Sequence, residues 1–238
     1  MADDNLERVG QLLSGHRIIG RDQIALCHLR DERFAARFED GLPRPSRNRG
    51  DGLGRPASDC AQTTQSIRER ASALRAGERE LRLIVAVGHN PCRLRIAHEL
   101  AEAGVQFATA IHPSAVVSPS AEIAPGCFIG PLAMVGCGAH ISQHAIINSG
   151  AIVEHDCNIE EGASVSPGAR LAGRVRIGRG AFVGTGAVVN PRLTIGSQAI
   201  VGGGAVVTRS VDPGLLVHGV PAKPVRGVDA DRDWQKLL

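Results

Sequence analysis

The sequence predicts a mainly β protein, built as a parallel β-helix that follows a small α/β segment. Three observations lead to this prediction. A strict six-residue repeat covers residues 115–210, every repeat has an aliphatic third residue, and a strand–helix–strand pattern stands just before the repeat. The chain of 238 residues is long enough for one or two domains, and its 43% hydrophobic content excludes a disordered chain.

The repeat runs through sixteen hexads without an insertion, from Ala115 to Ser210. The third position is always Val, Ile or Leu, and the first is nearly always small, with twelve Ala and two Cys. A unit of six residues that ends near Gly, Pro or Asn fits a short strand followed by a corner, and such units build a parallel β-helix. With three units to a triangular coil, residues eighteen apart stack about 4.7–4.9 Å apart. Sixteen hexads then make just over five coils.

The segment before the repeat has a different pattern. Leu81–Gly88 is an apolar run of strand length, Pro91–Ala103 has helical spacing of its apolar residues, and Val105–Ile111 is a second strand candidate. Strand, helix and strand in this order predict a βαβ unit, the element of a Rossmann-like domain.

The first eighty residues are rich in Arg and have no strong opening strand. Asn5–Leu13 and Asp22–Phe38 could be helices, whereas Pro43–Cys60 is typical of a loop. Two explanations stay open: the domain has diverged, or the segment is a wrong-frame translation of GC-rich coding DNA.

We therefore expect four parts along the chain. They are an N-terminal segment at 1–80, the βαβ remainder of a Rossmann-like domain at 81–113, the β-helix at 114–212, and a C-terminal cap and tail at 213–238.

Charge and composition limit which partners and which cellular compartment we expect for this protein. The pI near 8.7 comes from 25 Arg and two Lys, but aromatics are only 3%, too few for a protein that stacks nucleic-acid bases. The uncharged run 123–153 is interrupted by five Gly and two Pro, so no membrane span is expected. The N-terminus lacks the pattern of a signal peptide, and the six Cys form no C-x-x-C pair, so we expect reduced thiols and a cytoplasmic protein.

Several motifs carry a family resemblance over about residues 83–226. The runs IINSGAIVEHDC, SPGARLAG, VGTGAVV, VGGGAVV and HGVPAKPV resemble the sugar O- and N-acetyltransferases among the hexapeptide acyltransferases. This group includes sialic-acid O-acetyltransferases and UDP-4-amino-sugar N-acetyltransferases. The resemblance implies a left-handed β-helix, a homotrimer with active sites between adjacent subunits, acetyl-CoA as co-substrate, and a sugar or sugar-nucleotide acceptor.

The EHD run provides the candidate catalytic residues. His155 is the fifth residue of its hexad and so belongs to a turn, where an imidazole near neutral pKa suits removal of a proton from an attacking amine or hydroxyl. A flanking carboxylate would orient the ring, and the resemblance gives this role to Asp156. Gly173 stacks one coil further on, and relatives use the matching N–H to bind an oxyanion. The alternative is that His155 is an ordinary solvated turn residue.

The resemblance also implies binding residues. Asn148 matches a family Asn on the acceptor side, and Gly88, at the end of the predicted strand, is the nucleotide-side candidate. The G-x-x-G-H turn of the family is matched only by Ser14-Gly15-His16.

On the cofactor side, four residues match positions that contact acetyl-CoA. Thr185 and Gly203 match the cradle of the pantetheine arm, although both could be plain corner residues. Lys223 could meet a phosphate of CoA or serve in the cap. Many relatives have a second His where this chain has Ser164.

Other chemistries fit less well. His140, His144 and His155 are not eighteen residues apart, so a zinc site is not expected. Cys127 and Cys157 occupy first positions of hexads and are expected to be packing residues. We therefore predict direct acetyl transfer from acetyl-CoA to an amino or hydroxyl group of a sugar, and the alternative is a non-catalytic trimeric β-helix that serves as a scaffold.

Overall fold

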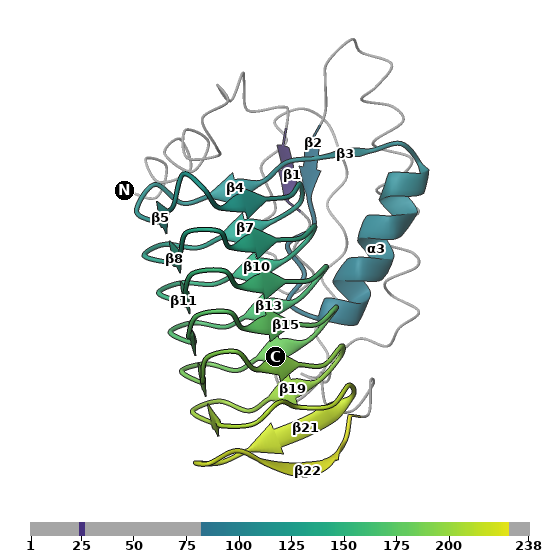
Figure 1. Cartoon of the computed structure of the whole chain (residues 1–238). Helices are drawn as coiled ribbons and strands as arrows, with labels where there is room; N and C mark the ends of the chain where they lie inside the picture. The colour runs from purple at the N-terminus through teal and green to yellow at the C-terminus, as the bar shows by residue number, and fades with distance from the viewer. Residues whose placement is uncertain (1–23, 27–81, 229–238) are drawn as a thin grey trace, which may run out of the picture.

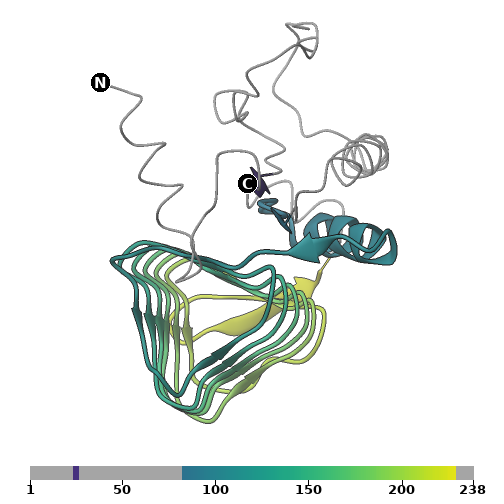
Figure 2. The same cartoon turned by 90° about the horizontal axis from the view of Figure 1, so that it is seen from above.

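The computed structural model describes residues 24–26, by their backbone alone, and 82–228. The main body is a three-sided parallel β-helix, with one helix lying beside its upper coils (Figure 1). Seen along its axis, the β-helix has a triangular cross-section (Figure 2). The predicted mainly β solenoid is confirmed.

Each side of the triangle is a sheet whose strands stack from coil to coil. The first sheet contains β4 (Ala110–Ile111), β7 (Phe128–Ile129), β10 (Ile146–Ile147), β13 (Ser164–Val165), β16 (Phe182–Val183), β19 (Ile200–Val201), β21 (Leu215–His218) and β22 (Lys223–Gly227). The second contains β5 (Val116–Val117), β8 (Met134–Val135), β11 (Ile152–Val153), β14 (Arg170–Leu171), β17 (Val188–Val189) and β20 (Val206–Val207). The third contains β6 (Glu122–Ile123), β9 (His140–Ile141), β12 (Asn158–Ile159), β15 (Arg176–Ile177) and β18 (Thr194–Ile195).

The register confirms the predicted eighteen-residue coil. Ile146 pairs with Ser164, and Ser164 pairs with Phe182, in parallel strands. The period ends after residue 210, because β21 pairs Leu216 with Ile200, sixteen residues away. β22 then turns back antiparallel to β21 and closes the sheet.

The third position of each hexad fills the interior, as predicted. From Ile129 to Val207 these aliphatic side chains are at most 1% exposed, and the small first-position residues pack beside them. Cys127 and Cys157 belong to this packed set, and their thiols donate hydrogen bonds to the carbonyls of Ser142 (3.0 Å) and Ala172 (3.2 Å). Burial raises the pKa of the Cys127 thiol to about 12, so it does not serve as a nucleophile at neutral pH.

The triangle has three corners, and each corner joins two of the sheets. The first corner joins the first sheet to the second, the second corner joins the second sheet to the third, and the third corner returns to the first sheet. The sixth residue of a hexad has a left-handed φ at all three corners, for example Leu132 at the first, Asp156 at the second and His144 at the third. This explains why Gly is frequent at that position.

The predicted βαβ unit is present before the β-helix. β2 (Arg82–Ile84), α3 (Asn90–Glu102) and β3 (Gln106–Phe107) follow in order, and β2 and β3 pair in parallel. The His89 Nδ1 caps α3 by accepting a hydrogen bond from the Cys92 N–H at 3.0 Å.

Three differences from the expected elements have local causes. The expected strand 105–111 is split into β3 and β4, because the chain changes partners. The Ala108 N–H donates to Leu83 of β2, whereas the Ala110 N–H donates to Cys127 of the β-helix. One further hexad, 109–114, therefore precedes the sixteen predicted hexads. It was not recognised in the sequence because it begins with Thr instead of a small apolar residue.

The second difference lies at β1 (Ile24–Leu26), which pairs in parallel with β2, within a segment expected to be helical. Three residues are too short a run to be detected as a strand from sequence. The third concerns the thiols: Cys92 is disulfide-bonded, while Cys127, Cys137 and Cys157 are free. The expectation of six reduced thiols was wrong for Cys92, because spacing does not reveal which side chains meet in space. The expectations for 1–23, 27–81 and 229–238 lie outside the described residues.

Candidate active site at two corners of the β-helix

The second corner presents the predicted catalytic pair. His155 and Asp156 form the turn after β11, and Asp156 has a φ of 56°. The His155 Nδ1 and the Asp156 Oδ2 are 2.9 Å apart, and about half of each side chain is exposed. An Nδ1–H that donates to the carboxylate leaves Nε2 as the basic nitrogen that faces away from the pair.

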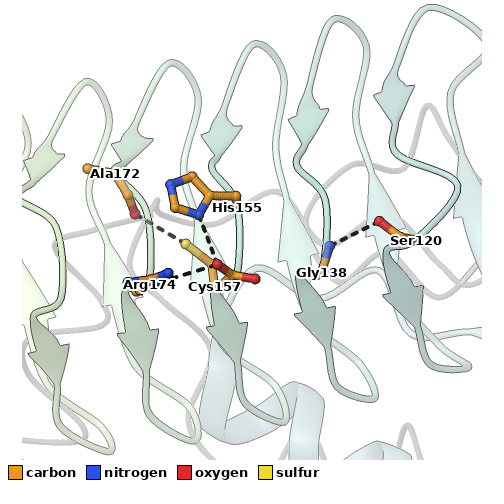
Figure 3. A network of polar contacts seen from close by, with 7 residues as sticks. Ser120, Gly138, His155, Cys157, Ala172 and Arg174 are labelled. Carbon is orange, nitrogen blue, oxygen red and sulfur yellow. Dashed lines mark hydrogen bonds and ion pairs between the residues drawn. The ribbon is translucent and has the colours of Figure 1, made fainter.

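A second cation supports the carboxylate. The Arg174 Nε lies 3.4 Å from the Asp156 Oδ2, so Asp156 lies between an imidazole and a guanidinium (Figure 3). The hydrogen bond from His155, and then that from Arg174, lower the pKa of Asp156 against the opposing effect of desolvation. The carboxylate is therefore ionised at neutral pH and available to hold the ring. Arg174 was not predicted, although the eighteen-residue period places it directly next to Asp156.

Gly173 lies under the His155 ring, as the coil spacing predicts. A Cβ at Gly173 would overlap the Nε2, Cε1 and Cδ2 atoms of His155, so only glycine leaves room for the ring in this position. The Gly173 carbonyl accepts from the Arg192 N–H, while its own N–H has no hydrogen-bond partner among the described residues. A free amide beside the basic nitrogen can bind an oxyanion.

A pocket of about 180 Å³ lies near the first corner. Its lining brings together four of the residues predicted from sequence: Gly88, Asn148, Ser164 and Thr185. The Asn148 Oδ1 accepts from the Ser149 N–H at 2.8 Å, which leaves its amide nitrogen to face a ligand.

The predicted cofactor residues separate into two groups. Gly203 stacks one coil beyond Thr185, whose carbonyl accepts from the Gly204 N–H at 2.8 Å, so both belong to the column of the first corner. Lys223 lies on β22, pairs with His218, and does not line the pocket.

Ser164 has its hydroxyl turned into a buried network. Its Oγ donates to the Asn90 Oδ1 at 2.7 Å and accepts from the Arg93 Nη2 at 3.0 Å. Ser164 is 5% exposed, and its hydroxyl is engaged with two side chains of α3. Asn90 and Arg93 were missed because their partners in the β-helix are 51 to 91 residues away in the sequence.

The two halves of the candidate site stand apart within one chain. Asn148 follows β10 at the first corner and His155 follows β11 at the second, so the width of the second sheet separates them. No cluster of three or more possible metal ligands occurs among the described residues. In the same part of the chain, no helix is long and apolar enough to cross a membrane.

Comparison with protein families gives one match. Residues 174–209 match the family described as bacterial transferase hexapeptide (six repeats). A comparison with curated protein sequences gave no match.

Solved structures give a longer match. Perosamine N-acetyltransferase from Caulobacter crescentus, solved as a histidine-to-asparagine mutant with CoA and GDP-perosamine, is 40% identical over 65% of this chain and 73% of that chain, with a TM-score of 0.63. The acetyltransferase domain of PglB from Neisseria gonorrhoeae, in complex with acetyl coenzyme A, is 39% identical over 61% of this chain and 71% of that chain, with a TM-score of 0.60. WeeI from Acinetobacter baumannii is 30% identical over the same shares, with a TM-score of 0.57. The chain belongs to the hexapeptide-repeat sugar acetyltransferase family.

Proposed function

We propose that this protein transfers the acetyl group of acetyl-CoA to the amino group of a nucleotide-activated amino sugar. The observation that carries the proposal is the His155–Asp156 pair over Gly173, in a chain 40% identical to a perosamine N-acetyltransferase solved with CoA and GDP-perosamine. The amino acceptor follows the named relatives, and the sequence alone left N- and O-acetylation open.

In this reaction His155 acts as the general base. Its Nε2 takes a proton from the acceptor amine as the amine nitrogen forms a bond to the thioester carbonyl carbon. Asp156 holds the ring and stabilises the imidazolium, and the Gly173 N–H donates to the oxyanion. The C–S bond then breaks and the CoA sulfur leaves with the proton that His155 returns. The thiols of Cys127 and Cys157 are buried, so neither serves as the nucleophile of a covalent intermediate.

The first corner provides the binding half of the site. Asn148 and Gly88 face the acceptor, while the column of Thr185 and Gly203 receives the pantetheine arm. From the Asn148 coil to the Gly203 coil is three steps, about 14 Å at the spacing of neighbouring strands. Lys223, beyond the end of this column, would meet a CoA phosphate.

A homotrimer would join the two halves. The outward residues of the second sheet are mostly apolar, namely Val116, Met134, Ile152, Val188 and Val206, with Arg170 among them. Those of the third sheet are polar throughout, namely Glu122, His140, Asn158, Arg176 and Thr194. An apolar face between two half-sites favours contact with another copy of the chain. In a cyclic trimer the second corner of one copy would face the first corner of the next.

The remaining features of the proposal concern architecture. We assign left-handed winding to the coils. We also propose that residues 81–113 are the remainder of a nucleotide-binding domain of Rossmann type. The parallel order β1-β2-β3, with α3 following β2, supports that domain.

The test is release of the CoA thiol from acetyl-CoA by the full chain. The acceptors are GDP-perosamine, UDP-4-amino sugars and sialic acid, each assayed with wild type and with His155→Ala. We expect turnover with an amino-sugar nucleotide and a loss of at least a hundredfold in His155→Ala, the usual contribution of a general base. Turnover that survives the substitution contradicts the mechanism. Silence across the panel from a folded protein favours the scaffold alternative.

A further inference from the structure

The most buried charge among the described residues is far from the catalytic pair. The Arg93 side chain, on the first turns of α3, is fully buried and has no carboxylate partner in the described part of the chain. Its guanidinium nitrogens instead lie within hydrogen-bond distance of five neutral acceptors. They are the carbonyls of Val87 (2.6 Å), Gly162 (2.7 Å) and His144 (2.9 Å), Asn90 Oδ1 (2.8 Å) and Ser164 Oγ (3.0 Å).

A buried charge is an unfavourable way to attach a helix, because the charge loses its hydration. Other contacts already dock α3 at the third corner. The Leu94 side chain occupies the space where a Cβ of Gly162 would lie, and the His98 Nε2 is 2.6 Å from the Glu161 Oε1. The specific contribution of Arg93 therefore lies in the segments that its hydrogen bonds connect.

Arg93 connects two walls of the pocket at the first corner. Its Nη1 binds the Val87 carbonyl, directly before Gly88, and its Nη2 binds the Ser164 hydroxyl on β13. Gly88 and Ser164 both line the pocket. Asn90 closes the network, because it accepts from Arg93 and Ser164 and donates to the Gly180 and Ala181 carbonyls.

We infer that Arg93 is a positioning residue that fixes the Gly88 turn against β13 and thereby sets the opening of the pocket to the nucleotide-sugar acceptor. This inference rests on the function proposed above. Arg93 acts through Val87 and Ser164 and touches no substrate itself. Ser164, where relatives have a histidine, then belongs to the frame of the pocket and not to the contacts with CoA.

Arginine suits this role because its donors point in fixed directions. A planar fork reaches the turn, the helix and two coils at once, whereas the ammonium of lysine has three donors at a single point. Arg93→Lys keeps the charge but must release some of the five acceptors, so it loosens the pocket wall without emptying the site.

The experiment compares Arg93→Lys with Leu94→Ala in the full-length protein. Leu94→Ala serves as the control because it weakens the docking of α3 without touching Val87 or Ser164. Steady-state kinetics with GDP-perosamine and acetyl-CoA measure kcat and both KM values. Amide hydrogen exchange on the peptide 83–90, without substrate, measures the fixation of the turn.

We expect Arg93→Lys to raise the KM for GDP-perosamine about tenfold, the effect of losing roughly one hydrogen bond to a charged group. The kcat and the KM for acetyl-CoA should stay within threefold of wild type. Exchange in 83–90 should be faster in Arg93→Lys than in Leu94→Ala, at matched loss of Tm. Ser164→Ala removes the hydroxyl through which β13 joins the Arg93 network, so it should also raise the KM for GDP-perosamine.

Two results would overturn the inference. One is an unchanged acceptor KM in Arg93→Lys, and the other is an equal effect of Arg93→Lys and Leu94→Ala on exchange and on both KM values. If wild type turns over no sugar nucleotide, the proposed function fails, and the exchange comparison still decides whether Arg93 fixes the turn.

Discussion

The geometry of the second corner depends on a missing side chain. His155 reaches over the next coil because Gly173 has no Cβ, and Asp156 and Arg174 hold the ring in that place. A single methyl group at residue 173 would occupy the space of the basic nitrogen.

Gly173→Ala is therefore expected to displace the imidazole and to lower activity at least tenfold. It should also lower the Tm, because overpacking costs about 1–3 kcal/mol. In a His155→Ala background the added methyl group meets no ring, so the same substitution should lower the Tm much less. Thermal unfolding of the four proteins measures this coupling. An equal Tm loss in both backgrounds would contradict the packing of His155 over Gly173.

The proximity of His155 to Gly173 could be predicted from sequence because both residues obey the period of the coil. His155 and Gly173 are eighteen apart, and the same rule would have found Arg174 from Asp156. Arg93 obeys no such rule. Its partners His144, Gly162 and Ser164 lie 51, 69 and 71 residues away, and only the docking of α3 brings them together.

At the scale of the element, each strand from β4 to β20 is a two-residue unit with one inward and one outward side chain. β18 shows this division clearly, since Ile195 is fully buried and Thr194 is exposed to solvent on the third sheet. Stability should depend on the inward residue alone.

We expect Ile195→Ala to lower the free energy of unfolding by about 2–5 kcal/mol, through lost burial and a cavity. Thr194→Ala, the adjacent control in the same strand, should change it by less than about 0.5 kcal/mol. Urea unfolding followed by circular dichroism measures both. Similar losses in the two variants would be incompatible with the inward and outward assignment.

The hexads could be predicted as elements because the packing repeats every six residues and requires an aliphatic residue in each repeat. α3 was predictable from its own spacing, and the observed helix differs from the expected one by a single residue at each end. β1 could not be predicted, because its three residues, which pair with β2, are too few to show a periodic pattern. The division of residues 105–111 between two sheets also depends on distant partners.

At the scale of the whole molecule, one chain holds the two proposed half-sites at different corners. The His155 half lies at the second corner, and the Asn148 half, with its pocket, lies at the first. The apolar outer face of the second sheet lies between them. Each complete site is therefore expected to be made by two copies.

The most direct test is complementation between two inactive variants. His155→Ala removes the base, and Asn148→Arg fills the pocket of the acceptor. The two are co-expressed with different tags, and assemblies that carry both tags are purified and assayed for thiol release from acetyl-CoA. In a cyclic trimer of mixed composition one of the three sites is intact, so we predict roughly a third of wild-type activity per trimer. Mixed assemblies as inactive as either parent would contradict the shared site.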